Sequence, residues 1–508
     1  MKNIVVFSEN NKFILELFKD KNFKKQFSIK CIIASVINLK NLKDSFKNEK
    51  IVTIENFTKS NLEFIPKNKK NLMDVNNYKI FSKIESECIK MLDFSNPNQD
   101  KFTLIDARQL YTDSVEFILN FLEHFKPDIV FFTNSPHSFQ SYILYKICEI
   151  KNIKTIFKRE ISLPLNYIFQ NSILVNDDNF NFNSKKENSK VRIILKNYIK
   201  KIINNEKKNV QNIFLRLRNH KLIYRKKFFN NFYLFLIIRF LKLIPIYLIR
   251  YLKNLYIFYK FKNKDVLIVE DFIKDKNKSY KKSYTSKIKM DFELFLGDLR
   301  KFKLLNYYNH KVTETDFSEK FIYFPLHYQP EATTYPFGGN YVDQLKAINL
   351  ISEYFENCKI YIKEHPDTFN ISQLAWTRGD YTRSNNFYDQ ISNIKNVKLI
   401  DLKVNTFDLI DNAHAVATVS GAVGLESLIK GKHTLILGYP WYNKFSQAFQ
   451  FKNHEYISSN LKTYMNKKIS KSKTIKEINE IANNIFSINE VSNEIGINRI
   501  RNLIKMKL

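Results

Sequence analysis

Short apolar segments alternate with amphipathic ones along the first third of the chain, and this alternation restricts the fold more than any other feature. The clearest unit combines helical patterns over 114–125 and 142–150 with strand patterns over 129–132 and 154–157. Strands and helices that follow one another with short connections predict a parallel sheet covered by helices on both faces. We therefore expect an open, Rossmann-like α/β domain over residues 1–184.

The same alternation returns in the second half of the chain. Apolar strand patterns stand at 265–269, 321–325, 359–362, 397–400, 415–418 and 434–437. We expect a second Rossmann-like domain over residues 265–490, followed by a helical tail over 491–508. Two such domains face each other across a cleft, and ligands of such sheets lie beyond the carboxyl ends of the strands. The loops that follow strands are therefore the places in which to search for a site.

A strongly basic segment, residues 185–264, separates the two units. It holds 22 of the 82 lysines and arginines against two acids, which gives it +20 of the formal net charge of +32. Its apolar runs at 228–238 and 243–249 are too short to span a bilayer. Aromatic, aliphatic and cationic residues alternate at helical spacing there, which is typical of a helix lying on an anionic membrane surface. A solvated helical insertion is the alternative, and nucleic-acid binding is less favoured because no recognised module surrounds the segment.

The cysteines and the start of the sequence indicate a cellular compartment. The four cysteines lie far apart, at Cys31, Cys88, Cys148 and Cys358, with no metal-ligand spacing between any pair. Reduced thiols in the cytoplasm fit this pattern. The first apolar run ends at Ser8, which is too short for the apolar core of a signal peptide. We expect a cytoplasmic protein that lies peripherally at the inner membrane.

Three loops of the second domain carry candidate ligand-binding residues. The turn Lys363-Glu364-His365-Pro366 directly follows a strand, and its proline holds the imidazole where it can donate to a phosphate oxygen. An ordinary strand exit with a surface histidine is the alternative. The loop after 321–325 offers Gln329 and Glu331, among many other hydrogen-bonding groups, unless it is a plain solvent loop.

The third loop runs from Thr418 through Ser420 and Gly421 into a helix that contains Glu426. Helix N-termini attract phosphate through unpaired amides, and the serine can add a hydroxyl. The glutamate can accept from ribose hydroxyls. The alternative is a helix capped by its serine. The loop has neither the Gly-Lys-Ser/Thr ending of a Walker A motif nor the G-x-G-x-x-G of a dinucleotide site.

Candidate proton acceptors lie in the first domain. His137 follows the strand pattern at 129–132, Glu160 follows the one at 154–157, and Asp106 is a third candidate. Any of them could deprotonate an attacking hydroxyl. The alternative is that His137 neighbours a helix cap and Glu160 is a surface acid.

These motifs resemble those of bacterial capsule and surface-polysaccharide biosynthesis proteins, and are similar to those of capsular Kdo transferases and, more distantly, bacterial sialyltransferases. The resemblance is good over 318–445 and loose over 1–160. It implies a two-domain GT-B glycosyltransferase whose His365-Pro366 turn and Ser420 helix start hold the phosphate and ribose of a CMP-activated sugar. Glu426 is a plausible further contact in that comparison.

The expected function is therefore transfer of a sugar from a nucleotide-activated donor, preferably CMP-linked, to a hydroxyl of a polysaccharide or lipid-linked glycan. No Asp-x-Asp triplet occurs in the chain, so we expect no metal and no cofactor beyond the donor substrate. A helix N-terminus with nearby cations can stabilise a departing phosphate without a metal. The alternatives are transfer of a phosphorus-containing group from a CDP-linked carrier, a UDP-sugar donor, or a non-catalytic membrane-binding or nucleic-acid-binding protein.

Overall fold

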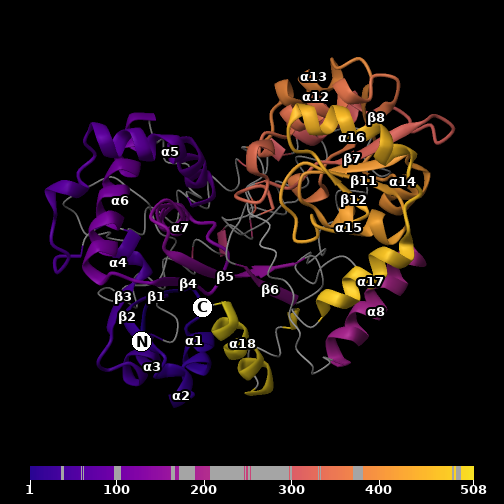
Figure 1. The fold of residues 1–508 in the computed structure, drawn as a ribbon. Coiled ribbons are helices and arrows are strands. Elements are labelled where there is room, and N and C mark those ends of the chain that lie inside the picture. The colour runs from indigo at the N-terminus through magenta and orange to yellow at the C-terminus, as the bar shows by residue number, and fades with distance from the viewer. Residues whose placement is uncertain are drawn as a thin grey trace.

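The computed structural model shows two α/β units side by side (Figure 1). The residues that it describes are 1–35, 39–58, 60, 62–95, 104–161, 166–170, 189–205, 245, 248–249, 252, 297, 300–301, 303–329, 331, 333–369, 382–482, 485–487 and 494–507. Most of the basic segment 185–264 and the strand expected at 265–269 lie outside the described residues.

The first unit is built on a seven-stranded sheet of order β13-β6-β5-β4-β1-β2-β3. The neighbouring pairs from β3 to β5 are all parallel, and β6 joins antiparallel to both β5 and β13. The strands are β1 (Lys2–Ser8), β2 (Phe27–Ala34), β3 (Lys50–Thr53), β4 (Ile129–Phe132), β5 (Lys154–Glu160), β6 (Asn166–Gln170) and β13 (Phe486–Ser487). The expected strand at 129–132 is confirmed residue for residue.

Helices cover both faces of this sheet. Its helical segments are α1 (Asn11–Leu17), α2 (Lys21–Lys24), α3 (Leu39–Ser45), α4 (Ile54–Thr58), η1 (Lys69–Asn71), α5 (Val75–Ser95), α6 (Leu104–Phe125) and α7 (Phe139–Ile150). One core lies between the sheet and α5, α6 and α7, and the other lies between the sheet and α1, α3 and the last helix. The long helix α5 was not expected from the sequence, and α6 begins ten residues before the predicted start at 114.

The second unit is built on a six-stranded sheet in which every neighbouring pair is parallel, of order β12-β11-β10-β7-β8-β9. The strands are β7 (Phe321–Pro325), β8 (Lys359–Lys363), β9 (Val397–Leu399), β10 (Ala415–Thr418), β11 (His433–Ile436) and β12 (Ala448–Gln450). Counted from β7, the order is 3-2-1-4-5-6, the doubly wound order of dinucleotide-binding sheets.

Helices sandwich the second sheet as well. They are α12 (Gln344–Tyr354), α13 (Asn385–Ser392), α14 (Thr406–Asn412), α15 (Ala422–Ile429), α16 (His454–Asn466) and α17 (Lys471–Ile481), with short turns η4 (Gly339–Tyr341) and η5 (Pro366–Phe369). Helix α8 (Ser189–Ile203) buries its apolar side against α15 and α17 and lies beside α17 in Figure 1. The start of the basic segment is thus a helix packed on the second unit.

The chain returns to the first unit at its end. Strand β13 pairs with β6, and helix α18 (Glu494–Lys507) packs beside α1 (Figure 1). Arg501 of α18 is buried and donates to the main-chain oxygens of Leu17 and Glu16. The second domain therefore ends before β13 rather than at residue 490, because β13 completes the first sheet. The expected helical tail docks on the first domain.

Two parallel-sheet α/β domains joined by a returning C-terminal segment confirm the expected α/β class and GT-B type of fold. Among the described residues, no helix is long and apolar enough to cross a membrane.

Candidate functional site

The second sheet has its topological switch point between β7 and β10, where the strand order reverses. Ligands of open α/β sheets bind in the crevice at such a point, beyond the carboxyl ends of the strands. The loop after β7 begins with Leu326 and His327, and the loop after β10 contains Ser420 and Gly421. The two loops expected to bind a ligand therefore meet at the position that the topology favours.

His327 joins these two loops. Its Nε2 accepts from the amide of Ser420 at 3.3 Å and lies 3.2 Å from the hydroxyl oxygen of Thr418. Burial is the main cause that lowers the pKa of His327 to about 3, and electrostatic coupling to His365 and Arg383 lowers it further. The ring is therefore neutral at physiological pH, and its contact with the Ser420 amide assigns the proton to Nδ1.

The glycines at this junction make room for protein side chains. A Cβ on Gly421 would lie 2.6 Å from Cε1 of His327, and one on Gly424 would collide with the hydroxyl of Tyr442. The Ser420 hydroxyl donates to the main-chain oxygen of Thr333. Ser420 and Gly421 thus shape the helix start, and their contact with a donor stays a prediction. The unpaired amides of the first turn of α15 are those that helix geometry leaves at residues 422 and 423.

At the turn after β8, the side chains make contacts within the protein that were not expected from the sequence. Lys363 is buried, and its Nζ donates to the main-chain oxygen of Val404 at 2.6 Å and lies 3.2 Å from the hydroxyl of Thr406. Its ammonium therefore holds the loop before α14. The contact of Lys363 with a donor stays a prediction.

Glu364 is also buried and internally bonded. One carboxylate oxygen accepts from the amide of His365 at 2.7 Å and the hydroxyl of Thr368, and the other accepts from Arg383 at 2.7 Å and Tyr388 at 2.9 Å. Four donors fill the acceptor capacity of the carboxylate. Glu364 therefore supports the turn from inside, and its contact with a donor stays a prediction.

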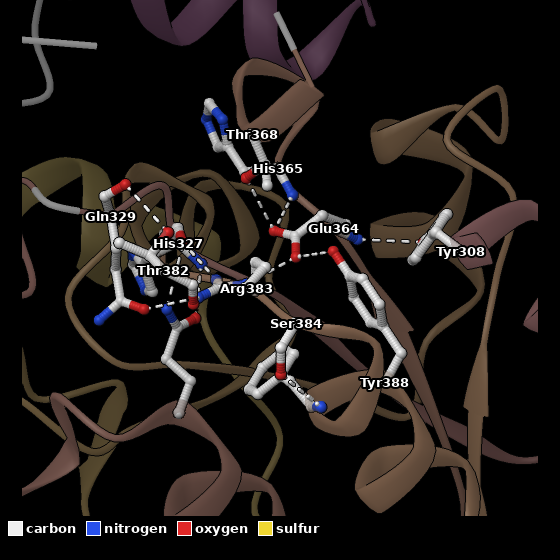
Figure 2. Close-up of polar contacts among 12 residues, drawn as sticks. Tyr308, His327, Gln329, Glu364, His365, Thr368, Thr382, Arg383, Ser384 and Tyr388 are labelled. Carbon is white, nitrogen blue, oxygen red and sulfur yellow. Dashed lines mark hydrogen bonds and ion pairs between the residues drawn. The ribbon is translucent and has the colours of Figure 1, made fainter. Parts of the chain in front are cut away.

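Arg383 is the centre of this network (Figure 2). Besides Glu364, its guanidinium donates to the side-chain oxygen of Gln329 at 2.6 Å and to the main-chain oxygens of His327 and Thr382 at 2.9 and 3.0 Å. Its side chain is 1% exposed. One planar, multidentate cation thereby ties the loop after β7 to the loop after β8. Gln329 is part of this support, and its contact with a donor stays a prediction.

His365 is the member of the turn that reaches solvent, with a side chain 36% exposed. Pro366 begins η5, as expected of a proline that fixes a turn. The Nδ1 atom of His365 accepts from the amide of Asp367 at 3.2 Å, which assigns the proton of the neutral ring to Nε2. Its ring centroid lies 5.9 Å from that of Tyr328, the neighbour of His327. His365 and the start of α15 are therefore connected through the loop after β7.

Glu331 lies where the two domains face each other. Its side chain accepts from the hydroxyl of Thr333 at 3.1 Å. The residue is exposed by surface area, yet desolvation by the surrounding protein and the negative charges of Asp367 and Glu160 raise the pKa of Glu331 to about 7. Glu160 comes from the first domain and Asp367 from the second, so charges of both domains act on Glu331.

The first domain also has a polar edge. Nδ1 of His137 lies 2.6 Å from the main-chain oxygen of Ser135, which assigns the ring proton to Nδ1 and leaves Nε2 as the basic atom. Glu160 is exposed at the end of β5. Asp106 is exposed in the first turn of α6. The catalytic roles of all three residues stay predictions.

Glu426 lies on the side of α15 that faces α8. Its negative charge contributes, after burial, to raising the pKa of the buried Tyr198 of α8, of Tyr442 and of Tyr323. Its contact with a ribose stays a prediction.

Several residues of the site were missed from the sequence. His327 and Arg383 hold the loops together. Lys158 lies near Glu160 and Glu9, because the charges of both carboxylates act on the pKa of Lys158, which burial lowers. Arg383 had one signal in the sequence. Only 13 of the 82 lysines and arginines are arginines, so an arginine in this chain is a candidate for a position that needs the planar, multidentate guanidinium.

The fold and the site together define a two-domain protein of the GT-B class, with the loops of its second domain gathered at the switch point. Residues 335–476 match the family model described as capsule polysaccharide biosynthesis protein. This match confirms, over those residues, the resemblance drawn from the His365-Pro366 turn and the Ser420 helix start. His327 and Glu331 lie just before the matched range.

Among solved structures, two from Thermosulfurimonas dismutans are similar to the chain: KpsC beta Kdo 2,7 transferase and KpsC beta Kdo 2,4 transferase. Both are 18% identical, with TM-scores of 0.22 and 0.23, and the similarity covers 41% and 37% of this chain and 62% and 55% of theirs. The chain thus spans less than two thirds of either one.

The UDP-GlcNAc 2-epimerase from Neisseria meningitidis, bound to UDP-GlcNAc, is 13% identical at a TM-score of 0.23 and covers 94% of this chain and 98% of that one. No curated protein matches the chain. The functional argument below rests on the family match and on the geometry of the site.

Proposed function

We propose that the protein is a glycosyltransferase of capsule or surface polysaccharide biosynthesis that uses a nucleotide-activated sugar, preferably CMP-linked. The observation that carries the proposal is the junction at the switch point, where His327 joins the loop after β7 to the start of α15 and His365 stands beside it. The match of residues 335–476 to capsule biosynthesis proteins supports the biological setting.

The second domain would bind the phosphate of the donor. The amides of residues 422 and 423 at the start of α15 and the Nε2–H of His365 are donors suited to an oxygen that gains negative charge as the nucleotide leaves. His327 is neutral, so it supports the loop without adding a charge. The Glu364–Arg383 pair holds the two loops at fixed spacing.

The first domain would bind the acceptor. His137 or Glu160 takes the proton of the acceptor hydroxyl, whose oxygen forms a bond to the anomeric carbon while the bond from that carbon to the phosphate oxygen breaks. Cytidine monophosphate leaves with the bonding electrons. Closure of the domains around Glu331 would keep water from the donor.

The setting of the reaction completes the proposal. The basic segment 185–264 would place a cytoplasmic enzyme on the anionic inner membrane, beside a lipid-linked acceptor. Removal of residues 206–264 should weaken co-sedimentation with anionic vesicles. Unchanged co-sedimentation would exclude the membrane role of that segment.

A nucleotide panel tests the donor assignment. Thermal stability is measured with CMP, CDP and UDP, for the wild-type chain and for His365→Ala, with the exposed His310→Ala as a matched control. We expect the wild type and His310→Ala to be stabilised most by CMP, and His365→Ala to lose most of that shift while unfolding at an unchanged temperature without ligand. Stabilisation by CDP alone would favour a phosphorus-group transferase, UDP alone a UDP-sugar enzyme, and no shift with any nucleotide would contradict the proposal.

A further inference from the structure

Arg159 connects the two domains next to the candidate site. It is the penultimate residue of β5, and its side chain reaches the second domain at Tyr439. Its side chain is buried, and its guanidinium donates to the main-chain oxygen of Tyr439 at 2.7 Å and stacks 3.5 Å from the centroid of the Phe337 ring. Burial of a cation is costly, so a contact of this kind indicates a specific requirement.

The two partners of Arg159 belong to loops that frame the start of α15. The amide of Tyr439 donates to the main-chain oxygen of Phe337 at 2.8 Å, and the amide of Gly438 donates to that of Val419 at 2.8 Å. The loop that contains Phe337 also accepts the Ser420 hydroxyl, through Thr333. Arg159 therefore touches the same structure that shapes the proposed phosphate site.

The residue after Arg159 is Glu160, a candidate proton acceptor. Successive side chains of a strand point to opposite sides, so a contact that fixes Arg159 also fixes the direction of Glu160. The charge of Glu160 acts on Glu331 across the space between the domains. The distance between Glu160 and the bound sugar donor thus depends on the position of the Arg159 guanidinium.

We propose that Arg159 is a positioning residue, which sets the acceptor-side Glu160 at a fixed distance from the donor loops of the second domain. This inference rests on the proposed function and adds to it a residue that acts on the transfer step and not on nucleotide affinity. Lysine cannot replace the arginine, because an ammonium cannot stack flat on Phe337 while it donates along the fork to the Tyr439 carbonyl.

The test compares Arg159→Lys with Arg501→Lys. Arg501 is a second buried arginine that donates to main-chain oxygens, at the contact of α18 with α1 and away from the site. We expect Arg159→Lys to lower kcat for sugar transfer by about 100-fold, the loss that a misplacement of about 1 Å causes. Its Kd for CMP should stay within about three-fold of the wild type, and hydrolysis of the donor should rise relative to transfer. Arg501→Lys should leave all three readouts unchanged.

Equal loss of kcat in both variants, an unchanged kcat in Arg159→Lys, or a fall in CMP affinity as large as the fall in kcat would overturn the inference. If the wild type binds no nucleotide, the proposed function fails, and small-angle scattering then decides the positioning role separately. A wider separation of the domains in Arg159→Lys than in Arg501→Lys supports it, and identical profiles overturn it.

Discussion

Replacement of Glu364 by glutamine should destabilise the second domain more than any other single change at the site. The carboxylate is fully buried and accepts four hydrogen bonds, one of them from the buried Arg383. Glutamine has nearly the same size as glutamate but carries no charge. Its NH2 group is a hydrogen-bond donor and would face donors that the carboxylate now accepts from. Breaking a buried ion pair on one side leaves the other charge uncompensated and costs about 3–5 kcal/mol.

The matched control is Glu480→Gln, because Glu480 pairs with Lys476 at 3.8 Å on α17 of the same domain and both side chains are exposed, 59% and 78%. Exposed pairs contribute about 0–1 kcal/mol. Urea unfolding followed by tryptophan fluorescence reports this domain, since Trp441 is buried in it and the other tryptophan of the chain, at position 376, falls between β8 and α13 in the sequence. A loss for Glu364→Gln no larger than that for Glu480→Gln would refute the reasoning.

Three further predictions concern the same loops. The folded-state pKa of His327 lies below its ordinary value of 6.5, so only the unfolded chain binds a proton at this ring between pH 6.5 and 3. The free energy of unfolding should therefore fall by about 1.4 kcal/mol for each pH unit as the pH drops from 6.5 toward 3. In urea unfolding, His327→Gln should show a weaker dependence of this free energy on pH. The pKa of Glu331 is raised from 4.5 to about 7, so ionisation of this carboxyl opposes folding, and the wild type should lose stability as the pH rises from 4.5 to 7. Thermal unfolding across that pH range should show a smaller loss of stability in Glu331→Gln. Gly421→Ala should cost about 1–3 kcal/mol in urea and abolish the CMP shift, because its methyl group would overlap His327; an unchanged variant would show that the junction is loose.

The fold was largely predictable because the central strands are continuous apolar runs buried on both faces. β4 and its neighbours follow directly from this pattern. The return of β13 to the first sheet was not predictable, since its pairing with β6 joins residues more than 300 positions apart. A strand of two residues is also too short to show an alternation of apolar and polar side chains. The long helix α5 escaped because its lysines and glutamates weaken the apolar stripe.

The position of the candidate loops was predictable, whereas the internal contacts of their residues were not. Polar residues after β7, β8 and β10 were expected at one edge, and the structure places them there. Yet Lys363 and Glu364 are bonded inside the protein, to Val404 at 41 positions and to Arg383 at 19 positions along the chain. A polar residue at a strand end can bind a ligand or support a loop, and only its distant partners decide which.

The central claim is that the phosphate of the donor binds at the start of α15 beside His365. A crystal structure with a bound cytidine nucleotide tests it most directly. We expect a phosphate oxygen within about 3 Å of the amides of residues 422 and 423 and of Nε2 of His365. A nucleotide bound at another strand edge, or one whose phosphate leaves both the α15 amides and the His365 ring without contact, would contradict the claim.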